Sequence, residues 1–289
     1  MSASSILKQL VRSLFRRAGF EITKLENDSG DRLWLDGLGG REDPFSDIKR
    51  LSQAWNYPIK CFFDVGANDG ATTRAALLCF ADIRVYAFEP HPHTFLRLRE
   101  NIPGTRFHPF NMALGDRAGS AELFSCDNDK INSLVQDAPF ATRFKQRSKP
   151  INVEISTIDD FCAAHGIAAI DVLKIDTEGY DLFVLKGAAQ KLANQEIKFV
   201  YAEFNDVFEH AGITGGTLFS ICEYLYPFGF RLIATYTDCL CLETKSEFFS
   251  VHNALFALPP SSLKRIDTLN LQQSSARSPH CIRSENLSE

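Results

Sequence analysis

An alternating series of strand-like and helix-like segments between residues 60 and 258 constrains the fold of this chain more than any other feature. The strand-like segments are short apolar runs, whereas the helix-like segments between them place apolar residues three and four positions apart. Parallel strands need long crossover connections, which are usually helices. The alternation therefore predicts an α/β fold, in which a mostly parallel sheet has helices on both of its faces.

The elements are assigned from these runs and from the turn residues between them. The predicted strands are 61–65, 84–88, 106–113, 121–125, 152–156, 171–175, 198–203, 230–235, 239–242 and 253–258. The predicted helices are 71–80, 94–101, 158–165, 182–193 and 217–226. No helix separates the last three strands, so we expect them to close the sheet as antiparallel strands.

Two extensions flank this predicted domain of residues 60–258. Residues 1–59 contain an irregular connection at 27–47, a short helix at 48–55 and, at 6–17, an amphipathic helix with a basic polar face. This basic helix is typical either of peripheral attachment to an anionic membrane or of packing on the domain or on a protein partner; the second interpretation is favoured. Residues 259–289 are rich in Ser, Gln, Asn and Arg and predict a flexible polar tail.

Composition limits the classes of protein to which the chain can belong. The net charge is −5, and five of the basic residues lie before residue 25, so the remainder is acidic and unsuited to nucleic acid. The eight cysteines form no CxxC pair, which indicates a reducing environment. No apolar run is long enough to span a bilayer. We expect a cytoplasmic protein, with peripheral membrane contact as the alternative.

A glycine turn lies where the first predicted strand leads into its helix. Gly66 and Gly70 allow a tight turn at the carboxyl end of a strand, where open α/β sheets bind nucleotide-like ligands. Asn68 stands where a dinucleotide site has the glycine that admits a pyrophosphate. Asp64 and Asp69 add negative charge. The turn therefore favours a ligand without phosphate that carries positive charge, such as S-adenosylmethionine, over a tight turn with no ligand.

Acidic residues end two of the other predicted strands. Glu89 follows the second strand, about 20 residues beyond the last glycine, where an acid accepts hydrogen bonds from ribose hydroxyls. Asp176 and Glu178 follow the strand at 171–175, where they would contact an acceptor hydroxyl and orient or deprotonate it. Lys174 lies two residues before Asp176 and on the same side of the strand, as a catalytic group or as a structural partner for a carboxylate.

Six motifs occur in order between residues 60 and 258. They are Asp64–Gly70, Phe88–Pro90, Asn111–Asp116, Thr157–Phe161, Leu173–Tyr180 with Val184–Ala188, and Asn253–Phe256. In this order they resemble the FkbM family of methyltransferases. The resemblance implies a Rossmann-like class I methyltransferase fold, S-adenosylmethionine as cofactor, and transfer to oxygen of a small-molecule or saccharide acceptor.

The resemblance also implies roles for single residues. By this resemblance, the glycine turn binds the methionine part of the cofactor, Glu89 binds the ribose, and the segment that follows the third strand lies against the adenine. The cofactor-binding residues are thus Asp64, Gly66, Ala67, Asn68, Gly70, Glu89, Asn111, Met112 and Ala113. Ser133 matches a family position whose role cannot be derived. Glu203, at the end of a later strand, would either help Asp176 hold Mg²⁺ or act as a plain carboxylate; the second interpretation is favoured, and no metal is expected.

Two other functions compete with methyl transfer. A nicotinamide-dependent oxidoreductase has the same sheet type, but Asn68 opposes it. A non-catalytic adaptor with a methyltransferase-like domain would have no physical need for acids at Asp64, Glu89 and Asp176.

Overall fold

The computed structural model describes residues 21–23, 32–36, 43–125, 132–135, 150–204, 216–243 and 248–260. The chain divides into a compact unit, Met1–Pro259, and a second unit, Pro260–Glu289. The helix expected at 6–17 and the tail beyond residue 260 lie outside the described residues. Among the helices that are described, none combines the length and the apolar character needed to cross a membrane.

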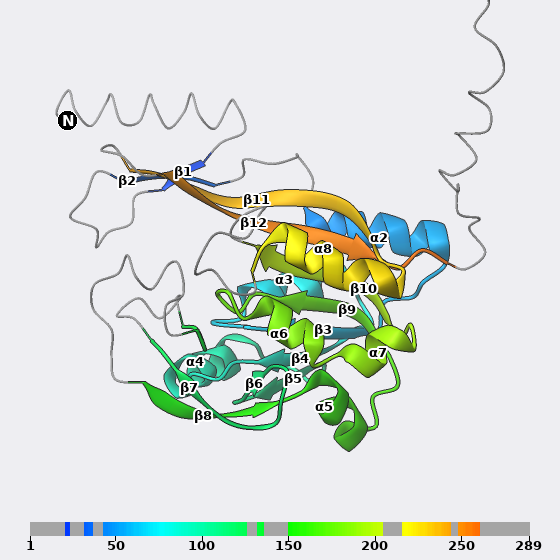
Figure 1. Ribbon diagram of the computed structural model, residues 1–289, viewed down its shortest axis with the longest axis horizontal. Coiled ribbons are helices and arrows are strands. Elements are labelled where there is room, and N and C mark those ends of the chain that lie inside the picture. The colour runs from blue at the N-terminus through cyan, green and yellow to red at the C-terminus, as the bar shows by residue number, and fades with distance from the viewer. Residues whose placement is uncertain are drawn as a thin grey trace, which may run out of the picture. The chain divides into compact units, whose positions relative to one another are not determined.

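A nine-stranded sheet forms the centre of the first unit, in the order β1-β2-β11-β12-β10-β9-β3-β4-β5 (Figure 1). The parallel strands are β3 (Cys61–Val65), β4 (Arg84–Phe88), β5 (Phe107–Phe110), β9 (Ile170–Ile175) and β10 (Ile197–Phe204). The antiparallel strands are β12 (Phe248–Ala257), β11 (Arg231–Glu243), β2 (Arg32–Asp36) and β1 (Glu21–Thr23). The predicted parallel sheet with closing antiparallel strands is confirmed.

Helices cover both faces of this sheet. On one face lie α2 (Pro44–Trp55), α3 (Ala71–Cys79) and α4 (Pro92–Asn101). On the other lie α5 (Ile158–His165), α6 (Asp181–Lys186), α7 (Ala189–Ala193) and α8 (Leu218–Leu225), which ends in the 3₁₀ turn η1 (Tyr226–Phe228). Successive side chains of a strand point to opposite faces. Phe62 and Phe63 are therefore both fully buried, but in different cores, as expected of strands covered on both sides.

A second, three-stranded sheet corrects the strand predicted at 106–113. That segment is two strands, because only β5 joins the main sheet, whereas β6 (Ala113–Leu114) pairs with β8 (Ile151–Ser156). β8 also pairs with β7 (Gly119–Leu123). The break falls at Asn111, whose side-chain amide donates to the carbonyls of Glu89 and Pro90 and so turns the chain at the end of β5.

Three further boundaries differ from the sequence prediction. The helix expected at 182–193 is broken into α6 and α7 at Gly187, where a Cβ would lie 1.9 Å from the Gly115 carbonyl oxygen. The two strands expected at 230–235 and 239–242 are one long strand, β11, which is bent by two irregularities in its pairing with β12. The segment 27–47 is not wholly irregular, because β2 extends the sheet along β11 and α2 starts at Pro44.

Candidate active site

The glycine turn lies at the point where the strand order of the sheet reverses. From β3 the chain moves to β4 and β5 on one side, whereas β9 and β10 lie on the other side. Ligands of open α/β sheets bind in the crevice that forms at such a point, beyond the carboxyl ends of the strands. The turn and the end of β9 meet there, because the Asp176 amide donates to the Val65 carbonyl at 3.0 Å.

The turn itself requires glycine at two positions. Gly66 has a φ of +74°, and a Cβ on it would lie 1.8 Å from the Asp176 carbonyl oxygen. Gly70 has a φ of +89°, and its Cβ would lie 2.8 Å from Ile102. The amides of Gly66 and Ala67 both donate to the Phe88 carbonyl at 3.0 Å, which fixes the turn against β4. A side chain at residue 66 would therefore separate the two halves of the site.

Glu89 holds the turn at the end of β4. Its side chain is only 4% exposed, and its carboxylate accepts from the Asn68 amide at 3.0 Å and from the His91 amide at 2.8 Å. Burial raises the pKa of Glu89 to about 7, although these two hydrogen bonds act in the opposite direction. The structure thus brings Glu89, the glycine turn and Asn111 together, as the predicted cofactor site requires.

Lys174 and Asp64 form a buried ion pair beneath the turn. The lysine ammonium lies 3.0 Å from Asp64 Oδ1 and 3.4 Å from Asp176 Oδ2, and it donates to the Gly66 carbonyl at 2.8 Å. Asp64 also accepts from the Thr73 hydroxyl at 2.6 Å and is fully buried. Burial alone lowers the pKa of Lys174, but Asp176 and Asp64 outweigh it and raise the pKa above its usual value. Lys174 is therefore a cation that joins the turn to Asp176.

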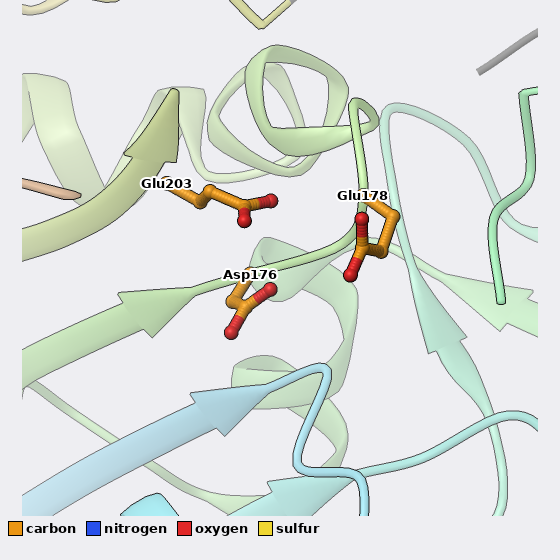
Figure 2. A group of neighbouring side chains, drawn as sticks. All are labelled: Asp176, Glu178 and Glu203. Carbon is orange, nitrogen blue, oxygen red and sulfur yellow. The ribbon is translucent and has the colours of Figure 1, made fainter. Parts of the chain in front are cut away.

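Three carboxylates converge beside this cation. Asp176, Glu178 and Glu203 each place an oxygen within 4.8 Å of the others, and Figure 2 shows the three side chains pointing toward a common space. Asp176 and Glu203 are neighbours because β9 and β10 pair in parallel, with Ile175 beside Ala202. The Asp176 side chain is 35% exposed, whereas Glu203 is buried. Such a group can bind acceptor hydroxyls, and its oxygens are of the kind that hold Mg²⁺ or Ca²⁺.

Glu178 reaches this group through a strained turn. Its φ is +53°, a left-handed conformation that is unusual for a long side chain. The Asp181 carboxylate accepts from the amides of Thr177 and Gly179, at 3.4 and 3.2 Å, and the Ser133 hydroxyl donates to the Glu178 carbonyl at 2.8 Å. Burial, with the negative charge of Asp176, raises the pKa of Asp181 to about 7.

The sequence predicted neither the role of Asp181 nor that of Ser133. The only signal for Ser133 was its place in the family motif series. In the structure its hydroxyl holds the backbone carbonyl of Glu178. The remaining predicted residues follow β5 and differ in burial: Asn111 is exposed, Met112 is partly buried and Ala113 is buried. His91 caps α4, since its Nδ1 accepts from the Thr94 amide.

Comparison with known proteins agrees with this architecture. The parallel sheet with its glycine turn and closing antiparallel strands defines a Rossmann-like class I methyltransferase fold. The model of the protein family described as "Methyltransferase FkbM domain" matches residues 64–232, which is more than half of the chain. The chain belongs to the FkbM methyltransferase family, and it is an S-adenosylmethionine-dependent methyltransferase. The oxidoreductase and adaptor alternatives are set aside.

Three named relatives are similar over the same domain. The 2-O-methyltransferase NoeI of Sinorhizobium fredii is 28% identical over 58% of this chain and 73% of its own length. The hexuronic acid methyltransferase AglP of Haloferax volcanii is 32% identical over 52% of this chain and 56% of its own length. The 31-O-demethyl-FK506 methyltransferase FkbM of Streptomyces tacrolimicus is 28% identical over 61% of this chain and 75% of its own length.

Proposed function

We propose that this methyltransferase transfers the methyl group of S-adenosylmethionine to a hydroxyl oxygen of a saccharide or another hydroxylated small molecule. The observation that carries the proposal is the position of Asp176. Its carboxylate is partly exposed, and it lies at the strand-order reversal, beside the glycine turn. The names of the three relatives, which specify oxygen as the acceptor atom or a sugar acid as the substrate, support the same class of acceptor.

The cofactor would lie along the turn. Its methionine part would contact the turn formed by Gly66, Ala67, Asn68 and Gly70, in which the two glycines adopt left-handed conformations. Glu89 would accept from the ribose hydroxyls, since each carboxylate oxygen has lone pairs beyond the one used by a backbone amide. Residues 111–113 would lie against the adenine. Asp64 is fully buried, so it would support the methionine part indirectly, through Lys174 and the Gly66 carbonyl.

The reaction needs one proton acceptor and close positioning. The acceptor oxygen forms a bond to the methyl carbon, the carbon–sulfur bond breaks with its electron pair on sulfur, and the hydroxyl proton passes to the Asp176 carboxylate. Glu178 would orient the same hydroxyl from the other side. The sulfonium is already an activated donor, so positioning supplies most of the rate.

The test uses labelled S-adenosylmethionine with a panel of acceptors that includes a neutral hexoside, a hexuronic acid and a non-sugar alcohol. With any acceptor that is methylated, Asp176→Asn is expected to lower kcat by about 10²- to 10⁴-fold, the range for loss of a positioned proton acceptor, while cofactor affinity changes little. Glu154→Gln, on the exposed side of β8, is the matched control and leaves kcat unchanged. An equal loss of kcat and of cofactor affinity in Asp176→Asn would contradict a role at the acceptor.

A further inference from the structure

The peptide group between Glu178 and Gly179 is held at both of its polar atoms. The Ser133 hydroxyl donates to its carbonyl oxygen at 2.8 Å, and the Asp181 carboxylate accepts from its N–H at 3.2 Å. Ser133 and Asp181 are each only 1% exposed. A peptide group is planar, so contacts at both atoms fix the orientation of the whole group. Two buried side chains therefore restrict the backbone at Glu178.

The second sheet holds Ser133 in place. The Ser133 amide donates to the Phe124 carbonyl at 3.0 Å, and the Ser133 carbonyl accepts from the Phe124 amide at 2.9 Å. Phe124 follows β7, which pairs with β8. The Val135 amide donates to the Ser133 hydroxyl oxygen at 3.0 Å. A hydroxyl has one proton to donate, and that of Ser133 is directed to the Glu178 carbonyl. The β6-β8-β7 sheet thus carries a contact with the turn of Glu178.

Glu178 needs such contacts because its own conformation is unfavourable. Its φ of +53° lies in the left-handed region, which long side chains seldom adopt. The backbone conformation sets the direction of the Cα–Cβ bond and so the region that the carboxylate reaches. In this conformation a Glu178 carboxylate oxygen lies within 4.8 Å of oxygens of Asp176 and Glu203 (Figure 2). The place of Glu178 in the site therefore depends on a turn that Ser133 and Asp181 hold.

We propose that Ser133 is a positioning residue for methyl transfer. With Asp181 it holds the Glu178–Gly179 peptide, so that the Glu178 carboxylate faces the acceptor hydroxyl. The one proton of its hydroxyl is already used, so Ser133 acts through Glu178 and not by contact with the cofactor or the acceptor. A misplacement of about 1 Å can cost roughly a hundredfold in rate, so one hydroxyl outside the site can affect the reaction. The inference rests on the proposed function for the role of Glu178.

Hydrogen exchange of the Gly179 amide, measured by NMR in the full chain, tests the contact without an acceptor. Ser133→Ala removes the hydroxyl, so this amide is expected to exchange about tenfold faster than in the wild type. Ser156→Ala is the matched control, because the Ser156 hydroxyl also donates to a backbone carbonyl, that of Thr157, at 3.4 Å. It should leave the exchange of Gly179 unchanged. Calorimetry should give the wild-type affinity for S-adenosylmethionine in both variants.

A double-mutant cycle tests the role in the reaction, with any acceptor of the panel that is methylated. Ser133→Ala is expected to lower kcat by about tenfold, because Glu178 is then misplaced. In Glu178→Ala, the added Ser133→Ala should lower kcat no further, since the carboxylate that Ser133 positions has already been removed. Ser133→Cys keeps a weaker donor and should restore part of kcat. Ser156→Ala should keep the wild-type kcat.

Two results would overturn the proposal. One is an unchanged exchange rate for Gly179 in folded Ser133→Ala, which would show that the hydroxyl does not hold this peptide. The other is a loss of kcat in the double variant that equals the product of the two single losses, which would show that Ser133 does not act through Glu178. If Ser133→Ala does not fold, Ser133→Cys replaces it in both measurements. If no acceptor of the panel is methylated, the proposed function fails, whereas the exchange rate still decides whether Ser133 holds the turn.

Discussion

Glu178 has a strained backbone and is one of the three carboxylates that converge at the ends of β9 and β10. A left-handed conformation costs an ordinary residue about 1 kcal/mol, and glycine adopts it without that penalty. Backbone strain persists where the surrounding structure enforces it, and it is concentrated at functional sites. The hydrogen bonds from Ser133 and to Asp181 are the contacts that enforce it here.

Replacement of Glu178 should therefore separate stability from activity. We expect Glu178→Gly to raise the free energy of unfolding by about 1 kcal/mol and to lower methyl transfer. Glu178→Gln keeps the strain and should unfold at the same urea concentration as the wild type. Urea denaturation measures both variants. A fall in stability for Glu178→Gly would show that the carboxylate stabilises the fold and that its backbone carries no strain.

Glu89 predicts a pH dependence of stability. Its pKa is raised from 4.5 to about 7 in the folded protein, so between these values the folded state binds more protons than the unfolded state does. Its contribution is thus fully present below about pH 4.5 and is lost as the pH rises to about 7. We expect the stability difference between the wild type and Glu89→Gln to shift against the wild type by on the order of 2 kcal/mol across this range. Urea denaturation at several pH values measures it, and a difference that does not change with pH would contradict the assignment.

Among single residues, the sequence predicted those that end strands and offered Lys174 as a structural partner for a carboxylate, but it did not specify the contacts that the supporting residues make. Glu89 and Asp176 follow apolar runs, so their place at the carboxyl edge of the sheet could be predicted. Lys174 contacts Asp64, more than 100 positions away in the chain, and Asp181 acts by bonding to the backbone of a turn. Such contacts depend on strand register and on local backbone conformation, neither of which a single sequence specifies.

Among the elements, the turn between β3 and α3 packs so closely against the end of β9 that it leaves no space for a side chain at residue 66. Gly66 and Gly166 both have left-handed φ values, +74° and +64°, but a Cβ at Gly166 meets nothing within 4 Å. Gly166→Ala should lose about 1 kcal/mol of stability from backbone strain alone.

Gly66→Ala should lose several times more stability and should abolish cofactor binding, because its Cβ would displace the end of β9. Thermal unfolding and calorimetric titration with S-adenosylmethionine compare the two variants. Equal losses in both would mean that the close approach of the turn to Asp176 does not matter.

The elements themselves were predicted well where they are buried on both faces. Strands β3, β4, β9 and β10 are largely apolar runs, and the structure confirms them within a residue or two. Errors occur where a tertiary contact overrides the local pattern. The contact of Gly187 with Gly115 divides α6 from α7, and the Asn111 amide ends β5, although the residues around each break favour continuity.

For the whole molecule, the order of strands brings the cofactor side and the acceptor side of the site together. The glycine turn and Glu89 belong to β3 and β4, whereas Asp176 and Glu203 belong to β9 and β10 on the other side of the strand-order reversal. The Lys174 ammonium touches both sides. A buried ion pair often stabilises a fold no more than apolar residues of similar volume do. The Lys174–Asp64 pair is therefore better explained by its place between the two sides of the site.

Calorimetric titration with S-adenosylmethionine and, separately, with NAD tests the central claim most directly. The wild type should bind S-adenosylmethionine saturably and NAD not at all. Binding should be at least tenfold weaker in Glu89→Ala and intermediate in Glu89→Gln, which keeps one hydrogen-bond acceptor. Binding of NAD alone, or an S-adenosylmethionine affinity that is the same in folded Glu89→Ala as in the wild type, would contradict the placement of the methyl donor along the glycine turn.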